Sequence, residues 1–347
     1  MPLIEDVLAS GTNLFDFLVR GGLADTRRTP STVIAEGPKQ TVHRYTEQVP
    51  VEGPPVLLVP PLGAPAVCMD LRRGCSLAEH LVLSGRPSYL VDYGPMAFED
   101  RAHGLEFWIR DVLPAAIRAV SEDRGGEPVQ LVGWCLGGLF SLLTTAAFPE
   151  LPVSAVAMIA SPVDLSKVRL ADPLRLLGKV TGGQIVGTAL RTLGTVPANL
   201  VSLAFKTTAL STYLRKPLTV LKYSTDRDAL AHIEAVDDMM RNMYGYPGRA
   251  IAQAYHRLVR ANELATGHVE GPTRTVHLAD VRVPVMNIAG DSDVLAPEAA
   301  AHHVVRILPN APEVRLHTAP GGHLGVLTGR TAAETTWTYL DSFLDES

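Results

Sequence analysis

The sequence predicts an α/β fold with a mostly parallel central sheet and an inserted helical segment. Short apolar runs bounded by proline and glycine recur along the chain, and amphipathic stretches of helical period separate them. This rhythm lapses for more than a hundred residues in the second half of the chain. Strands that alternate with helices form βαβ units, whose parallel sheet is covered by helices on both faces.

The apolar runs are predicted to be strands because each is short and apolar at nearly every position, as a strand buried on both faces must be. They comprise residues 54–61, 88–93, 128–133, 154–160 and 283–290, and the more polar residues 41–49 are predicted to form an exposed strand. Helical periods follow some of these runs, at residues 105–120 and 138–147. Residues 331–346 are predicted to close the chain as an amphipathic helix.

Three regions follow from this pattern. Residues 1–40 are predicted to form an N-terminal helix and linker, and residues 41–163 together with 283–347 the α/β core. Residues 164–282 lack the strand rhythm and are rich in Leu, Arg, Met and Tyr, so we expect a helical cap. One core with an inserted subdomain fits a chain of 347 residues.

Composition excludes several classes of function. Of the residues, 46% are hydrophobic and 19% are charged, which supports a large buried core. The formal net charge is −5 and no run of Lys and Arg is present, so nucleic acid is not an expected partner. No uninterrupted apolar stretch is long enough for a transmembrane segment, and the N-terminus does not resemble a secretory signal, so we expect a cytoplasmic location.

No cofactor is expected from the motifs. The three cysteines form no C-x-x-C pair, which gives no sign of a zinc site or a disulfide framework. Paired metal ligands and a phosphate-binding loop of the G-x-x-x-x-G-K-[ST] type are also missing. At least one thiol is therefore free to act as a nucleophile.

The strongest chemical signal surrounds Cys135. Residues 131–138, Leu-Val-Gly-Trp-Cys-Leu-Gly-Gly, follow a buried strand and precede an apolar helix. This is the context of a nucleophile elbow of the α/β-hydrolase fold, in which flanking glycines allow a sharp strand-to-helix turn. The positive end of the helix dipole favours a thiolate there. The alternative, that Cys135 is only a small buried hydrophobe, explains none of the flanking glycines.

An acid and a histidine follow in the chain order that this fold uses. Asp293 lies in a loop at the end of a predicted strand, and we prefer it over Asp291, which is expected to cap the turn. His323 lies behind two glycines and is the predicted general base. The backbone N–H groups of Leu136 and Leu62, with Gly63 as the alternative to Leu62, are the predicted oxyanion-hole donors.

The elbow resembles the G-x-C-x-G-G box of polyhydroxyalkanoate synthases, which polymerise hydroxyacyl-CoA into storage polyester. Similar segments extend over residues 55–330, and they include Asp70-Leu71 and the stretch from Val91 to Gly94. These two are similar especially to the short catalytic subunits that act with a second subunit. Two positions depart from the family: Val294 replaces a histidine, and residues 223–226 read Tyr-Ser-Thr-Asp in place of Trp-Asn-x-Asp.

The resemblance implies an acyltransferase with Cys135 as nucleophile, His323 as base and Asp293 as its partner acid. Its substrate would be an acyl-CoA or an acyl-carrier thioester, and its acceptor a hydroxyl group. A partner subunit is implied as well, and a homo-oligomer stays open. Two other functions remain: a cysteine-dependent esterase or thioesterase that passes the acyl group to water, and a non-catalytic binding protein of the same fold.

Overall fold

The computed structural model describes residues 10–181, 194–208, 210–271 and 274–347. The described residues form an eight-stranded sheet of order β1-β2-β4-β3-β5-β6-β11-β12. Its strands are β1 (Ser31–Gly37), β2 (Gln40–Tyr45), β3 (Val56–Val59), β4 (Ser88–Asp92), β5 (Val129–Trp134), β6 (Val153–Ile159), β11 (Val285–Gly290) and β12 (Val314–Ala319). Strand β2 is antiparallel to both of its neighbours. Strands β4, β3, β5, β6, β11 and β12 are parallel to one another. The predicted fold class is confirmed.

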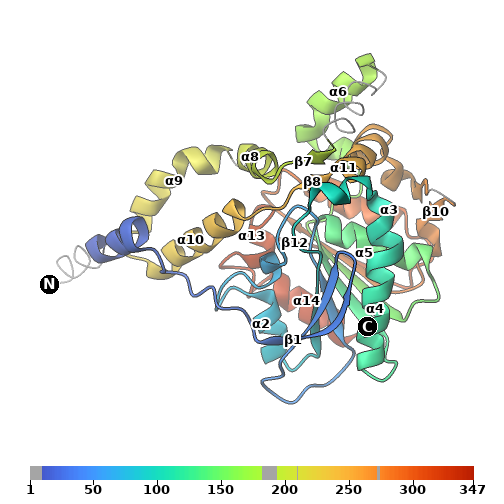
Figure 1. Cartoon of the computed structure of the whole chain (residues 1–347), viewed down its shortest axis with the longest axis horizontal. Helices are drawn as coiled ribbons and strands as arrows, with labels where there is room; N and C mark the ends of the chain where they lie inside the picture. The colour runs from blue at the N-terminus through green and yellow to red at the C-terminus, as the bar shows by residue number, and fades with distance from the viewer. Residues whose placement is uncertain (1–9, 182–193, 209, 272–273) are drawn as a thin grey trace.

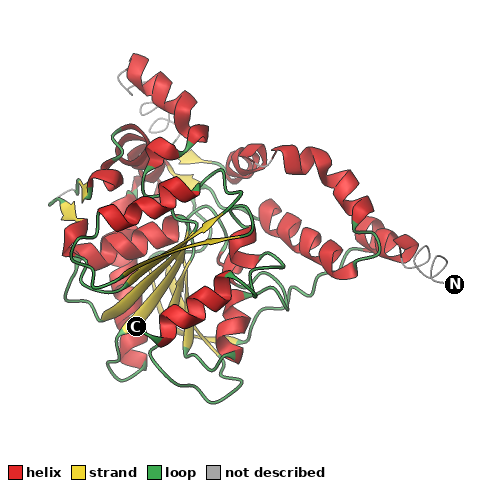
Figure 2. Cartoon of the chain, turned by 180° about the vertical axis from the view of Figure 1, so that it is seen from behind, coloured by secondary structure: helices red, strands yellow, loops and turns green. Residues whose placement is uncertain are grey.

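Helices cover both faces of the sheet (Figures 1 and 2). They are α2 (Leu77–Leu83), α3 (Leu105–Phe107), α4 (Leu113–Asp123), α5 (Leu136–Ala147), α12 (Glu298–Ala301), α13 (Gly325–Thr328) and α14 (Thr336–Asp345). Successive side chains of a strand point to opposite faces, so each central strand contributes to two apolar layers. In β3, Leu57 packs in the layer that contains Trp108, and Leu58 packs in the layer that contains Trp337.

Because β3, β5, β6, β11 and β12 are parallel, their carboxyl ends meet at one edge of the sheet. In open α/β sheets this edge is where ligands bind. The loops after these strands carry all the residues that the sequence singled out as catalytic, and this edge is therefore the place to look for a site.

Between β6 and β11 the chain leaves the sheet and is mainly helical. It contains α6 (Asp172–Thr181), α8 (Ala198–Thr208), α9 (Leu210–Lys222), α10 (Arg227–Arg241) and α11 (Gly248–Gln253). Two short strand pairs complete its described part: β7 (Thr195–Val196) with β8 (Tyr246–Pro247), and β9 (His268–Val269) with β10 (Val276–His277). Helices α8 to α10 and the N-terminal helix project from the α/β body as an arm (Figure 1).

Two strands differ from the sequence-based expectation. Strand β1 lies inside residues 1–40, which were predicted to be helix and linker, and it pairs with β2 at the edge of the sheet. Strand β12 was missed, and the chain was taken as a loop from Thr318. Both are edge strands with few fully buried side chains, so neither shows the apolar run by which the central strands were found. Residues 1–9 lie outside the described residues.

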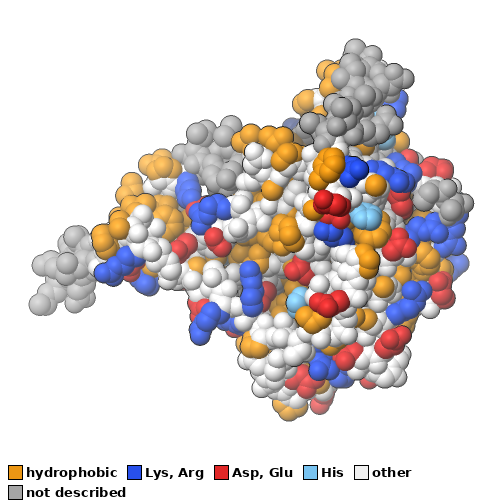
Figure 3. All heavy atoms as spheres, in the orientation of Figure 1, with side chains coloured by type: hydrophobic (Ala, Val, Ile, Leu, Met, Phe, Trp, Pro, Cys, Tyr) orange, Lys and Arg blue, Asp and Glu red, His pale blue; other side chains and the backbone are white. Residues whose placement is uncertain are grey.

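The arm carries exposed apolar side chains, which Figure 3 shows as an orange surface along it. Leu218 is 68% exposed and Leu221 60% exposed, and Leu18 and Val19 of the N-terminal helix are 71% and 67% exposed. Within the described ranges, every helix is too short or too polar to cross a lipid bilayer.

Candidate active site

Cys135 lies at the turn between β5 and α5. Its backbone has φ 54° and ψ −119°, in a region that residues with a side chain rarely adopt. The Cys135 N–H donates to the carbonyl oxygen of Ile159 on β6, over 2.8 Å, which fixes the turn to the neighbouring strand. Such strain persists only where the surrounding structure enforces it, and it is typical of functional sites.

Three glycines make this turn sterically feasible. A Cβ atom at Gly133 would lie 2.4 Å from the backbone nitrogen of Gly138, and one at Gly137 would lie 2.1 Å from the carbonyl oxygen of Val59. A Cβ atom at Gly138 would lie 2.2 Å from the hydroxyl oxygen of Ser161. Strand β5, the end of β3 and the first turn of α5 are thus packed too closely for any side chain at these positions.

The predicted base and acid, His323 and Asp293, lie together on neighbouring loops. His323 follows β12, and its Nδ1 lies 2.8 Å from Oδ2 of Asp293, which follows β11. The second oxygen of Asp293 accepts the N–H groups of Leu295 and Ala296 over 2.8 and 2.9 Å. Asp291 instead accepts the N–H of Gly321 and does not contact His323. The carboxylate that orients the histidine is therefore Asp293.

His323 also interacts with Cys135 and completes a Cys-His-Asp constellation. Its Nε2 atom is buried and makes no hydrogen bond of normal geometry. Burial alone lowers the pKa of His323, but the Cys135 thiolate and the Asp293 carboxylate outweigh it and raise this pKa to about 10. At neutral pH the imidazole is consequently protonated.

Two supporting side chains were not found from the sequence. Trp134 Nε1 donates to the carbonyl oxygen of His323 over 3.0 Å and holds the histidine loop over the elbow. The Ser161 hydroxyl donates to the carbonyl oxygen of Cys135 over 2.8 Å. Ser161 follows β6, so the parallel order of the strands was the signal that could have placed it beside the nucleophile.

The predicted oxyanion donors lie on the two segments that meet at the elbow. Leu136 is the first residue of α5, and Leu62 lies in the turn after β3. Among the described residues, neither backbone N–H donates a hydrogen bond to another protein group. Both are available to an anion, and their role in an oxyanion hole stays a prediction.

The other two thiols differ from Cys135 in exposure. Cys68 and Cys75 are buried, and Cys135 is partly accessible. Burial raises the pKa of both buried thiols and keeps them neutral. Cys135 is thus the thiol that a reagent or a substrate meets first.

A cavity of about 460 Å³ lies between the loop after β3 and helix α10. Arg28, Asp92, Met239 and Tyr244 are among its lining residues, which include no member of the triad. In the described part of the chain, no group of three or more His, Cys, Asp or Glu side chains is arranged to hold a metal ion.

The elbow, the ordered triad and the strand order together define an α/β-hydrolase site, and comparison with known families agrees. A profile of the alpha/beta hydrolase fold family matches residues 54–330. The chain belongs to this family.

Within this family, the chain is similar to several curated polymerase subunits. The chain is 28% identical to the poly(3-hydroxyalkanoate) polymerase subunit PhaC of Allochromatium vinosum, in an alignment that covers 92% of this chain and 89% of the relative. It is 27% identical to the protein of the same name from Synechocystis sp., over 86% of this chain and 79% of the relative. The Cupriavidus necator relative is 23% identical, and only 56% of it is covered. The predicted resemblance to polyhydroxyalkanoate synthases is confirmed, and the length matches the shorter relatives.

Solved structures support the fold alone. Rv0554 from Mycobacterium tuberculosis has a TM-score of 0.52 at 17% identity, over 91% of this chain and 99% of that one. Alpha/beta hydrolase domain-containing protein 10 from mouse has a TM-score of 0.51 at 16% identity, over 91% and 99% of the two chains.

Proposed function

We propose that this chain is a cysteine-dependent acyltransferase that forms an acyl-cysteine from a hydroxyacyl-CoA or carrier thioester and passes the acyl group to a hydroxyl acceptor. The observation that carries the proposal is a cysteine at the elbow, beside a hydrogen-bonded His323–Asp293 pair, in a chain similar to polymerase subunits over 92% of its length. A thioester suits this nucleophile because exchange between thiol and thioester is nearly isoenergetic.

The first half-reaction transfers the acyl group to Cys135. The thiolate attacks the thioester carbonyl carbon, and the electron pair of the carbonyl moves to oxygen. The N–H groups of Leu62 and Leu136 stabilise this oxyanion. When the intermediate collapses, the bond to the CoA sulfur breaks, and the departing thiolate takes the proton of His323, which the raised pKa keeps on the ring at neutral pH.

The second half-reaction releases the acyl group. His323 is now neutral and removes the proton of the acceptor hydroxyl, whose oxygen attacks the acyl-cysteine carbonyl carbon. The bond to the Cys135 sulfur breaks and the thiolate–imidazolium pair is restored. Burial of the His323 side chain, which is 11% exposed, and of Asp293, which is fully buried, supports transfer over hydrolysis because water is largely kept from the pair.

The test is incubation of the purified chain with 3-hydroxybutyryl-CoA, with free CoA, insoluble polyester and free 3-hydroxybutyrate measured together. We expect CoA release with polyester, both lost in Cys135→Ala. Free acid without polyester, also lost in Cys135→Ala, would make the protein a thioesterase. No CoA release and no acylated Cys135 with any acyl-CoA would overturn the proposal and leave a binding protein.

We also propose that the chain works in an assembly, because the relatives are named as subunits of a polymerase. Light scattering of the purified chain distinguishes a homo-oligomer from a chain that needs a different partner subunit. A multimer with full polymerase activity supports a homo-oligomer. A monomer whose activity rises only when another subunit is added supports a chain that needs a different partner. A fully active monomer contradicts both.

A further inference from the structure

Tyr246 belongs to the inserted segment but reaches the oxyanion loop. The backbone N–H of Gly63 is near enough to the Tyr246 hydroxyl to lower its pKa slightly. A Cβ atom at Gly63 would lie 2.4 Å from Cε2 and 2.6 Å from the hydroxyl oxygen of Tyr246. The phenol therefore rests directly on Gly63, where no side chain would fit.

Several backbone contacts hold Tyr246 in this place. Val196 and Tyr246 pair in the two-stranded β7–β8 ladder. The Tyr244 N–H donates to the carbonyl oxygen of Gly63 over 2.9 Å, so residues 244–246 contact both polar groups of this one peptide position. A Cβ atom at Gly245 would lie 2.7 Å from the carbonyl oxygen of Val196, which shows how closely the two strands are packed.

The hydroxyl is also close to the nucleophile. Burial first, and then the charge of the nearby Cys135 thiolate, raises the pKa of Tyr246 well above its ordinary value, so the hydroxyl keeps its proton. The Gly63 N–H is its backbone neighbour, and among the described residues no protein acceptor takes the hydroxyl proton. A protonated donor with a free hydrogen thus lies beside the Leu62–Gly63 turn and near Cys135.

We propose that the Tyr246 hydroxyl donates a hydrogen bond to the oxyanion that forms at the thioester carbonyl, so that the inserted helical segment supplies a catalytic residue to the α/β core. This inference rests on the proposed acyl transfer. Packing on Gly63 holds the phenol in place, and its hydroxyl is a third hydrogen-bond donor to the oxyanion beside the N–H groups of Leu62 and Leu136. No covalent bond to Tyr246 forms.

The variant Tyr246→Phe keeps the ring on Gly63 and removes only the donor. We expect kcat for CoA release from 3-hydroxybutyryl-CoA to fall by about 10²-fold, as for the loss of one oxyanion-hole donor, with KM changed by less than about threefold. Alkylation of Cys135 by iodoacetamide forms no oxyanion, so its rate should stay at the wild-type value. Tyr244→Phe, whose side chain lines the neighbouring cavity, is the matched control and should keep wild-type kcat.

A Tyr246→Phe enzyme with wild-type or higher kcat would overturn the inference, because the hydroxyl would then only fill the oxyanion position. Equal losses in turnover and in alkylation would also overturn it, because they indicate a displaced nucleophile. If the wild-type chain releases no CoA, the proposed function fails, and acylation of Cys135 by p-nitrophenyl acetate, followed by mass spectrometry, still compares the two variants. If the wild-type chain is acylated by neither reagent, both proposals fail.

Discussion

At the scale of single residues, the charge state of His323 decides what the site can do. A histidine that is protonated at rest cannot first act as a base, and its initial role is to protonate the leaving thiolate. The burial that makes the site dry would by itself remove this proton, and the two neighbouring anions keep it on the ring. The pKa of His323 therefore depends on both Cys135 and Asp293.

We expect the pKa of His323 to fall well below about 10 in Cys135→Ala, because Cys135 makes the largest contribution that raises it, while burial and Asp293 remain. The folded-state pKa lies above 6.5, so protonation of His323 stabilises the fold fully below about pH 6.5, and this stabilisation is lost as the pH rises through about 10. NMR titration of the imidazole measures the pKa directly, with solvent-exposed His268 as the internal control. An unchanged His323 pKa in Cys135→Ala would contradict the thiolate–imidazolium pair.

The two neighbouring acids should behave differently. Asp293→Asn removes the charge that orients His323 and helps to keep it protonated. We expect kcat to fall by roughly 10²-fold or more, which is the usual contribution of acid–base catalysis to the rate. Asp291→Asn leaves the histidine in place and should change kcat by less than about threefold, since Asp291 contacts only the Gly321 backbone in its loop. Steady-state CoA release measures both variants. Equal losses of kcat in the two variants would mean that the geometry of the loop, and not the charge of Asp293, determines the rate.

At the scale of elements, the elbow joins β3, β5 and the first turn of α5 through contacts that exclude side chains. The first turn of α5 abuts the end of β3 at Gly137, and the backbone of β5 abuts the same turn at Gly133. The site geometry is therefore set by backbone packing, and the nucleophile cannot move without displacing the sheet.

Gly137→Ala should disturb this packing severely. The new methyl group would meet the Val59 and Pro60 carbonyl oxygens, at 2.1 and 2.8 Å, and neither can move without breaking the end of β3. We expect a loss of about 1–3 kcal/mol in the free energy of unfolding, as for overpacked cores, together with lost CoA release. Gly325→Ala is the control, because nothing lies within 4 Å of its Cβ position. Urea denaturation measures both, and equal stability of the two variants would show that the elbow can relax.

The elements that the sequence revealed are those whose pattern is local. The central strands are apolar at nearly every position, and the glycines of the Gly-x-Cys-x-Gly-Gly segment indicate a sharp turn, so both were predicted together with His323 and Asp293. Strands β1 and β12 escaped notice because edge strands need no continuous apolar run. The places of Ser161 and Tyr246 beside the elbow were not predicted, because each depends on strand pairing across a long stretch of chain, which no local pattern encodes.

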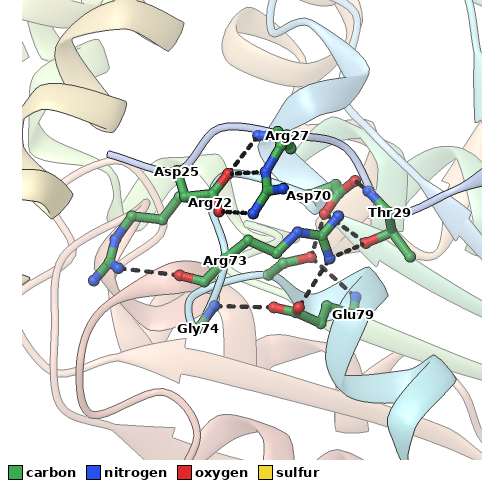
Figure 4. A network of polar contacts seen from close by, with 9 residues as sticks. Asp25, Arg27, Thr29, Asp70, Arg72, Arg73, Gly74 and Glu79 are labelled. Atoms are coloured by element: carbon green, nitrogen blue, oxygen red, sulfur yellow. Dashed lines mark hydrogen bonds and ion pairs between the residues drawn. The ribbon is translucent and has the colours of Figure 1, made fainter. Parts of the chain in front are cut away.

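At the scale of the whole molecule, the N-terminal segment connects the arm to the α/β body. On the body side, Asp70 accepts the backbone N–H and the hydroxyl of Thr29 over 2.7 and 3.0 Å, and Arg73 bonds both Thr29 and Glu79 (Figure 4). On the arm side, the Glu234 carboxylate of α10 accepts three successive backbone N–H groups, those of Gly22, Leu23 and Ala24, over 2.6, 2.7 and 3.0 Å. The segment thus ties α10 to the core.

The contact at Glu234 should control how firmly this segment is held. Glu234→Ala leaves three backbone donors without their shared acceptor, and bonds of this charge-assisted kind contribute about 1.5–3 kcal/mol each when shielded from water, less where they are exposed. We expect trypsin to cleave after Arg20, Arg27 or Arg28 several-fold faster in this variant, because proteolysis follows the population of the locally opened segment. Mass spectrometry of the early fragments measures the rate at each site.

Asp238→Ala is the matched control, since it removes a carboxylate from the same helix that pairs with Arg241 in its own turn. Cleavage after Arg20, Arg27 and Arg28 should then stay at the wild-type rate. Equal acceleration in both variants would mean that α10 itself unfolds, and no acceleration in Glu234→Ala would mean that the Asp70 side of the segment holds it alone. Helix α10 leads directly into Tyr246. The cleavage rate and CoA release of Glu234→Ala, measured on one preparation, therefore also show whether weakening the contact at Glu234 lowers catalytic activity.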